Sequence, residues 1–255
     1  MTTEVDAGLL VERTPHCLLL TLNRPQKANS LDPALVDALL KHVDTAAEDG
    51  TRLMVLRSNG RHFCAGFDFT DLDHQSDGEL LLRFVRIEQL LQKIYHAPFA
   101  TLALAHGRAM GAGADLFVAC NRRIATSDTA FAFPGARFGL ILGTRRLGTR
   151  IGAANVRELI SSGQSVPASW AHGVGLVNEI QSMDGWSETV QAHARTCAVL
   201  DPATQATLNQ ITNVDTRDAD MTALVASAAK PGLGQRIRTY RELVERAPSG
   251  PSLSN

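Results

Sequence analysis

The chain has 255 residues, of which 44% are hydrophobic and 20% are charged, and its formal net charge is −1. This composition predicts one large soluble domain, alone or with a small appendage. The nearly balanced charge, with no long basic block, argues against nucleic acid or an anionic membrane as the main partner.

Strand and helix patterns alternate over residues 8–180, which is typical of the α/β class. Short apolar runs predict the strands, and apolar residues at helical spacing predict the helices. The predicted strands are 8–12, 16–22, 53–56, 99–105, 123–126, 130–133 and a short strand near 177–180. The predicted helices in this part are 33–50, 80–95, 112–119, 145–160 and 166–172.

From Trp186 onward the pattern is helical only. It predicts four helices, at 187–199, 201–212, 217–229 and 234–246, followed by a frayed end over 247–255. The chain is therefore expected to divide into an α/β core over residues 1–185 and a helical region over residues 186–255.

The compartment is inferred from the cysteines and the N-terminus. Cys17, Cys64, Cys120 and Cys197 have no Cys-x-x-Cys spacing, and they indicate no disulfide framework. The first residues include Glu4 and have no apolar segment of a signal peptide. No run approaches the roughly 18 apolar residues that a membrane span requires. The expectation is a cytoplasmic protein.

The segment Gly111–Asp115 is the strongest candidate for chemistry. Small residues form a turn after an apolar run, and they let a ligand approach the backbone closely. The N–H groups at the start of the following helix lack partners within the helix, so they suit a developing negative charge on oxygen. Asp115, in the first helical turn, is placed to move a proton. The structural alternative is that Asp115 only complements the helix dipole.

A second turn of similar character, Cys64–Asp68, follows an earlier strand. Two converging N–H donors from such turns make an oxyanion hole.

Other kinds of site have no sequence support. The eight histidines show no metal-ligand spacing, so no metal site is predicted, and no nucleophile elbow or phosphate loop is present. The pairs Arg122–Arg123 and Arg145–Arg146 are interpreted as solvated surface, with phosphate binding as the alternative.

Five motifs in chain order resemble the crotonase superfamily, the enoyl-CoA hydratase/isomerase family. They are Leu22-Asn-Arg-Pro25, Ala28-Asn-Ser-Leu31, Phe63-Cys-Ala-Gly-Phe-Asp68, Gly111-Ala-Gly-Ala-Asp115 and Ala171-His-Gly-Val-Gly-Leu-Val177. The resemblance implies a spiral of ββα units, with a C-terminal helical region that builds homotrimers, often stacked as homohexamers. It also implies a coenzyme A thioester as the substrate, with no further cofactor.

By position in this family, the thioester oxygen would accept hydrogen bonds from the backbone N–H groups of Phe67 and Ala112, with Asp115 as the acid/base. The coenzyme A moiety is expected at residues matching the family's nucleotide and pantetheine contacts. These are Arg24, Lys27, Ala28, Ala65 and Asp68.

The chain departs from the family's pattern of two catalytic glutamates. Asp115 stands in place of the first, and Gly135, which has no side chain to transfer a proton, stands in place of the second. Three hypotheses follow. The first is a hydratase or isomerase that uses Asp115 alone. The second is decarboxylation or C–C cleavage of a carboxylated acyl-CoA, with Arg137 or His106 holding the extra carboxylate. The third is a non-catalytic acyl-CoA binder.

Overall fold

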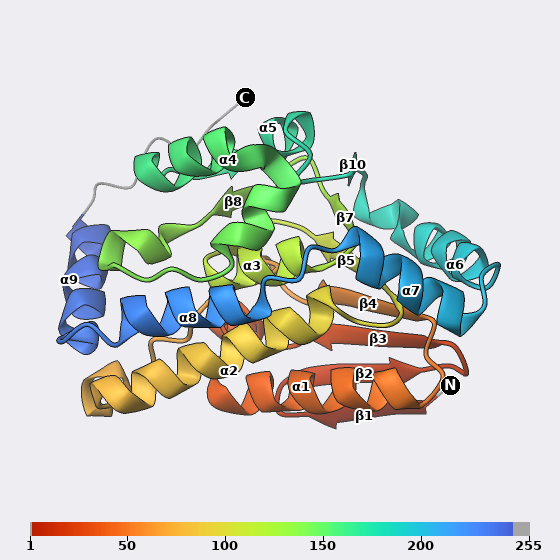
Figure 1. Ribbon diagram of the computed structural model, residues 1–255, viewed down its shortest axis with the longest axis horizontal. Helices are drawn as coiled ribbons and strands as arrows, with labels where there is room; N and C mark the ends of the chain where they lie inside the picture. Colours follow the sequence, from red (N-terminus) through yellow and green to blue (C-terminus); the bar gives the residue numbers. More distant parts are fainter. Residues whose placement is uncertain (1, 247–255) are drawn as a thin grey trace.

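The fold is built on two β-sheets (Figure 1). The computed structural model describes residues 2–246, and at Thr2 and Glu245 it describes the backbone alone. The larger sheet has the strand order β1-β2-β3-β4-β5-β7-β10. Its strands are β1 (Thr2–Asp6), β2 (Leu9–Arg13), β3 (Cys17–Leu22), β4 (Leu53–Ser58), β5 (Ala100–Ala105), β7 (Arg122–Ala125) and β10 (Glu179–Ile180). Pairing is antiparallel from β1 to β3 and parallel from β3 to β10.

The smaller sheet contains β6 (Arg108–Met110), β8 (Ala130–Ala132) and β9 (Val166–Pro167). The chain passes from β5 into β6 at Gly107, whose φ is +62°. A Cβ atom at Gly107 would lie 2.1 Å from the Arg61 carbonyl oxygen, so only glycine fits this crossing. The crossing brings β6 beside the loop that follows β4, where Cys64 and Ala109 form a parallel bridge.

Helices α1 (Pro33–Glu48) and α2 (Asp77–Tyr95) begin at capping residues that the sequence supplies. The Asp32 carboxylate accepts a hydrogen bond from the N–H of Leu35 at 2.8 Å, and Pro33 occupies the first turn. Ser76 and Glu79 form a capping box at the start of α2. Figure 1 shows α1, α2 and α8 side by side over one face of the molecule, and α2 contacts both of its neighbours.

The remaining helices complete the core. They are α3 (Ala112–Ala119), α4 (Thr144–Ser162), α5 (Ala168–Gly173), α6 (Trp186–Cys197), α7 (Pro202–Thr212), α8 (Arg217–Ala228) and α9 (Leu233–Arg246), with short 3-10 helices η1 (Pro25–Lys27), η2 (Leu72–His74), η3 (Pro134–Phe138) and η4 (Met183–Gly185). Every residue of α3 is buried. Trp186 of α6 packs with Val55 and Leu104 in a second apolar cluster, separate from the main core.

Helix α9 is anchored to α2 at its beginning. The Asp77 carboxylate accepts hydrogen bonds from the N–H groups of Gly232, Leu233 and Gly234, at 2.8, 3.1 and 2.9 Å. These bonds, that of Gly234 foremost, lower the pKa of Asp77. Because Asp77 also begins α2, one carboxylate fixes where the C-terminal helix returns to the core.

The structure confirms the alternation of strands and helices and the four C-terminal helices. Strands β1, β6 and β9 were not predicted. The boundary at residue 185 stays a prediction, and the fraying predicted for 247–255 lies outside the described residues. Within residues 2–246, no helix combines the length and the apolar character that a membrane crossing needs.

Candidate active site

The two small-residue turns are held together by a ladder of backbone hydrogen bonds. On one side, the N–H of Cys64 donates to the carbonyl of Arg108 at 3.1 Å, and the N–H of Met110 donates to the carbonyl of Cys64 at 2.9 Å. On the other side, the N–H of Leu31 donates to the carbonyl of Gly66 at 2.7 Å. The first turn is thus fixed between β6 and the segment that leads into α1.

This ladder leaves the predicted oxyanion donors unpaired. The carbonyl of Gly66 and the N–H of Asp68 both bond Leu31, so the extended backbone turns the N–H of Phe67 to the opposite side. Ala112 is the first residue of α3, so its N–H has no acceptor within the helix. Within residues 2–246 neither N–H donates a backbone hydrogen bond.

Gly66 lets the two turns approach each other. Its φ is +90°, and a Cβ atom there would lie 2.5 Å from the Met110 carbonyl oxygen and 3.3 Å from the Ala112 nitrogen. A side chain at Gly66 would therefore force the turns apart. The close approach places Phe67 and Ala112 on the wall of the same cavity.

This cavity has a volume of about 320 Å³ and is mostly apolar. Ala65, Phe67, Ala112 and Asp115, all predicted as site residues, line it. Its remaining wall comes from the loop after β4, from the turn before α3, from α2, from the segment 133–147, from the end of α4 and from α9. That wall includes Phe69, Phe84, Phe133, Pro134, Gly135, Phe138, Leu140, Leu142, Thr144, Leu147, Ile160, Tyr240, Arg241 and Val244.

Asp115 is the one carboxylate among the described residues that line this cavity. The residue is only 5% exposed, and its Oδ1 atom has no hydrogen-bond partner among the described residues. Burial raises the pKa of Asp115 well above its usual value; the Arg146 guanidinium opposes this shift and the Glu88 carboxylate adds to it. The Asp115 carboxyl group therefore stays protonated at pH values at which an exposed aspartate is already ionised.

A buried ion cluster lies close to Asp115. Arg146 of α4 donates to both carboxylate oxygens of Glu88 of α2, and the distance from its Nη1 atom to Glu88 Oε1 is 2.9 Å. The same Nη1 atom donates to Asp220 of α8 at 3.1 Å. Glu88 is fully buried and Arg146 is 3% exposed. The interpretation of Arg145–Arg146 as solvated surface is therefore wrong for Arg146. Arg123 of the other pair is also buried, and it donates to backbone carbonyls.

Gly143 packs directly against the candidate acid. A Cβ atom at this position would lie 2.2 Å from Asp115 Oδ1, and the φ of Gly143 is +65°. We expect Gly143→Ala to displace the carboxyl group and to lower kcat about 10- to 100-fold. Gly148→Ala in α4, the helix that begins directly after Gly143, is the control, since its Cβ would contact nothing within 4 Å. Equal steady-state rates for the two variants would contradict this expectation.

Of the residues predicted to hold coenzyme A, Ala65 lines the cavity, and the other four do not. Ala65 is exposed, and its N–H donates to the carbonyl of Ala28 at 3.0 Å. Lys27 is exposed beside them. Arg24 forms ion pairs with Asp32 at 2.8 Å and with Asp68 at 3.0 Å. The contact of these residues with coenzyme A stays a prediction.

Asp68 is integrated into its own turn. Burial by itself would raise the pKa of Asp68, but hydrogen bonds from Thr70, Ser30 and Arg24 lower it to about 2. Asp68 is thus an ionised partner of Arg24, and it does not line the cavity.

The structure offers no support for a second charged group at the predicted positions. Gly135 lines the cavity, where its backbone packs near the Leu140 carbonyl. Arg137 is exposed, with its guanidinium 5.7 Å from the centre of the Tyr240 ring. His106 is buried outside the cavity lining, with its Nε2 atom 2.7 Å from the Gly60 carbonyl oxygen. Neither residue lines the cavity, and a contact of either with a substrate carboxylate stays a prediction.

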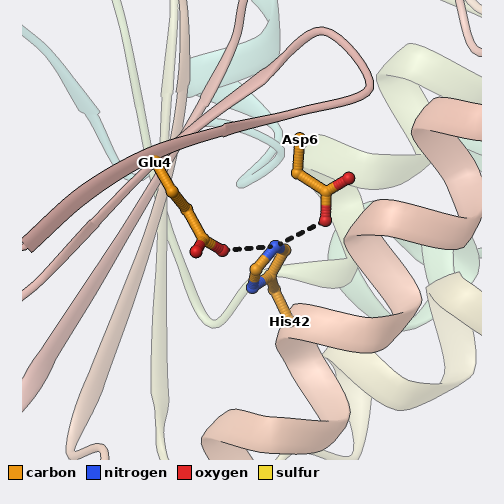
Figure 2. A group of neighbouring side chains, drawn as sticks. All are labelled: Glu4, Asp6 and His42. Atoms are coloured by element: carbon orange, nitrogen blue, oxygen red, sulfur yellow. Dashed lines mark hydrogen bonds and ion pairs between the residues drawn. The ribbon is translucent and has the colours of Figure 1, made fainter.

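One group of side chains elsewhere has the composition of a metal site. Figure 2 shows Glu4 and Asp6 of β1 facing His42 of α1, whose Nε2 atom lies 3.3 and 3.1 Å from their oxygens. Arg13, which can only donate, contacts the His42 Nδ1 atom at 3.1 Å, so Nε2 carries the imidazole proton. The group is best explained as a hydrogen-bonded link between β1 and α1.

Comparisons with known proteins identify the family of the chain. The family model "Enoyl-CoA hydratase/isomerase" matches residues 12–230. A solved structure from Bordetella parapertussis, assigned as an enoyl-CoA hydratase/isomerase, superposes with a TM-score of 0.91 at 46% identity, covering 92% of this chain and 98% of that one.

Two curated relatives are more distant. The "2,3-dehydroadipyl-CoA hydratase" of Escherichia coli (strain K12) is 32% identical over 180 residues, which are 69% of this chain and 70% of that protein. A "probable enoyl-CoA hydratase" of Bacillus subtilis (strain 168) is 35% identical over 167 residues. The match covers 64% of the Bacillus protein, so the chain spans just under two thirds of its length. Together with the α/β fold and the motif positions, these matches show that the chain belongs to the enoyl-CoA hydratase/isomerase family, with the crotonase fold.

Proposed function

We propose that the protein converts a 2-enoyl-CoA thioester by stabilising its enolate, with Asp115 as the only side chain that transfers protons. The observation that carries this proposal is the cavity itself. It places one buried carboxyl group, with an oxygen that has no hydrogen-bond partner among the described residues, beside two unpaired backbone N–H donors inside a mostly apolar wall. Such donors act most strongly on a developing oxyanion where water is excluded.

In this proposal the thioester oxygen accepts hydrogen bonds from the N–H groups of Phe67 and Ala112. Water adds to the β carbon, and the electron pair of the double bond moves to the enolate oxygen. Asp115 gives its proton to the α carbon, and its other oxygen takes a proton from the attacking water. The carboxyl group ends in its starting state, so one acid completes the addition without a partner at position 135.

The same carboxyl group also suits isomerisation. One oxygen of the Asp115 carboxyl group takes a proton from one carbon of the allylic system, and the other oxygen gives its own proton to the carbon two positions away, so the carboxyl group ends in its starting state and no water is needed. Product analysis separates the two reactions. Hydration yields a 3-hydroxyacyl-CoA, whereas isomerisation yields a shifted double bond.

The direct test is incubation with crotonyl-CoA, followed by loss of the enoyl-thioester absorbance and chromatography of the product. We expect turnover that requires the protonated form of Asp115. Because burial raises its pKa, kcat is expected to stay constant at low pH and to fall as the pH rises through that raised pKa. A rate that instead rises with pH across this range would show that Asp115 acts from its ionised form. Tight acyl-CoA binding without turnover would favour the non-catalytic hypothesis.

We also propose a homotrimer or homohexamer. The support is a group of exposed apolar side chains on and beside α7. This group consists of Val199, Leu208, Ile211 and Val214, with exposed fractions of 42% to 80%. Exposed apolar groups of this kind commonly mark subunit contacts. Light scattering of the wild type and of Ile211→Asp tests the assembly, and a wild-type monomer would refute it.

A further inference from the structure

The apolar cavity is unusually rich in aromatic rings. Five of the nine phenylalanines of the chain and one of its two tyrosines line it. These residues are Phe67, Phe69, Phe84, Phe133, Phe138 and Tyr240. They come from four separate parts of the fold: the loop after β4, α2, the segment after β8, and α9. The rings gather at the cavity although aromatic residues are only 5% of the chain.

Five of these six rings form two groups on the cavity wall. In the first, Phe67 stacks on Phe84 with ring centres 4.4 Å apart and contacts Phe69 at 5.5 Å. In the second, Phe138 and Tyr240 lie 5.3 Å apart at an angle of 48°. The first group includes the oxyanion residue Phe67, and the second includes a residue of α9. An acyl group whose thioester oxygen is bound by the oxyanion donors can therefore contact the first group of rings near the thioester and the second group beside α9.

The cavity is much larger than a short acyl chain requires. An apolar cavity of about 150 Å³ holds one benzene ring, and the volume here is about 320 Å³. A four-carbon acyl group would leave a large part of this space unfilled and its apolar wall uncovered. A phenyl ring joined to a three-carbon enoyl unit accounts for the volume and brings the ring to the aromatic wall.

We infer that the substrate carries an aryl acyl group, of the 3-arylpropenoyl class, with its ring held among these aromatic side chains. The inference rests on the proposed function only in taking a coenzyme A thioester as the ligand. Ring–ring contacts favour an aryl group over an alkyl chain of equal carbon number, because offset and edge-to-face pairs contribute beyond the burial of area.

The primary test measures binding, so it does not depend on turnover. Calorimetric titration of the wild-type protein compares saturated ligands: 3-phenylpropanoyl-CoA, nonanoyl-CoA with the same number of acyl carbons, butanoyl-CoA and adipoyl-CoA. We expect 3-phenylpropanoyl-CoA to bind most tightly, about fivefold more tightly than nonanoyl-CoA. Equal or tighter binding of nonanoyl-CoA, or preference for the carboxylate-ended adipoyl-CoA, would overturn the inference.

Variants locate the preference on the wall. Two substitutions, Tyr240→Leu at a half-buried position and Phe138→Leu, are each expected to reduce the ratio of aryl to alkyl affinity toward one. Leu243→Ala is the control on the same helix, since Leu243 is 57% exposed and does not line the cavity. An unchanged ratio in correctly folded Tyr240→Leu would place the aryl group elsewhere and contradict the inference.

The inference and the proposed function fail separately. If crotonyl-CoA is converted but no aryl preference is found, the substrate class is wrong and the reaction stands. If the aryl preference is found but neither crotonyl-CoA nor cinnamoyl-CoA is converted, the reaction is wrong and the ligand class stands.

Discussion

Asp115→Asn is expected to lower kcat for enoyl-CoA conversion by at least about 100-fold, because general acid–base catalysis contributes about 10²–10⁴ in rate. The amide has nearly the same shape as the carboxyl group, but it cannot donate and then regain the proton. The affinity for a saturated acyl-CoA is expected to change little, since the oxyanion donors Phe67 and Ala112 are backbone groups. Steady-state kinetics and calorimetry on the same preparation measure both effects.

The same substitution is expected to stabilise the protein at neutral pH. The folded protein binds the Asp115 proton more tightly than the unfolded chain does, because burial raises the pKa of this carboxyl group. For such a group, the free energy of unfolding falls as the pH rises from the unfolded pKa toward the folded pKa. Asparagine removes this loss, so the variant should have the higher melting temperature at pH 7, and the difference should shrink near pH 4.

A matched control distinguishes the role of Asp115 from a general effect of charge. Asp218→Asn removes an exposed carboxylate on α8, away from the cavity. It is expected to leave both kcat and the pH dependence of melting nearly as in the wild type. Full activity of Asp115→Asn would eliminate the proposed mechanism, whatever its effect on stability.

Arg146→Met is expected to destabilise the fold by about 3–5 kcal/mol, the usual result of removing one partner from a buried ion pair. The substitution leaves the carboxylate of Glu88 without a cation in a fully buried position. Asp220 also loses a partner, although it keeps contacts with Arg145 and Thr216. Denaturant unfolding monitored by circular dichroism measures the change.

Two further variants test why the protein is destabilised. Arg217→Met breaks an ion pair with Asp215 whose side chains are both more than half exposed, and it should lower the free energy of unfolding far less than Arg146→Met does. Arg146→Met with Glu88→Met replaces the central pair by apolar groups, and we expect it to recover most of the lost stability. If the double variant is no more stable than Arg146→Met, an unpaired buried carboxylate is not the cause.

The two small-residue turns that line the cavity were predictable because their signals are local. Small residues after a strand, a carboxylate in the first helical turn and the order of the family motifs all lie within short segments. Phe67, Ala112 and Asp115 accordingly line one cavity, as the resemblance implied. The caps of α1 and α2 were equally local, since a capping side chain bonds an N–H only three residues away.

The ion cluster depends on contacts that no local pattern carries. Arg146 meets Glu88 and Asp220 across separations of 58 and 74 residues. In the sequence, Arg146 stands next to Arg145, and two adjacent arginines are typical of a solvated surface. Only the packing of α2, α4 and α8 shows that Arg146 is buried. The role of Gly143 was hidden for the same reason, because its contact is with Asp115 of another helix.

The unpredicted strands have weak intrinsic signals. Residues Thr2–Asp6 are mostly polar, and they form β1 only because the turn at Ala7 and Gly8, both with positive φ, folds them back on β2. Strand β6 is three residues long and follows a glycine. Its pairing partners, Cys64 and β8, are distant in the sequence, so periodicity could not identify it.

The anchoring of α9 by Asp77 has a consequence for how such a protein can diversify. The carboxyl group that we propose as the acid and the proposed oxyanion donors belong to segments before residue 116, whereas Tyr240 and Val244 of α9 line the same cavity. The carboxylate that positions α9 bonds N–H groups at the start of the helix, so this anchor does not depend on the side chains of the following turns, although Ile237 in those turns is fully buried in the core. Substitutions in α9 can therefore change which ligands fit the cavity, while the residues proposed to act on the thioester stay the same.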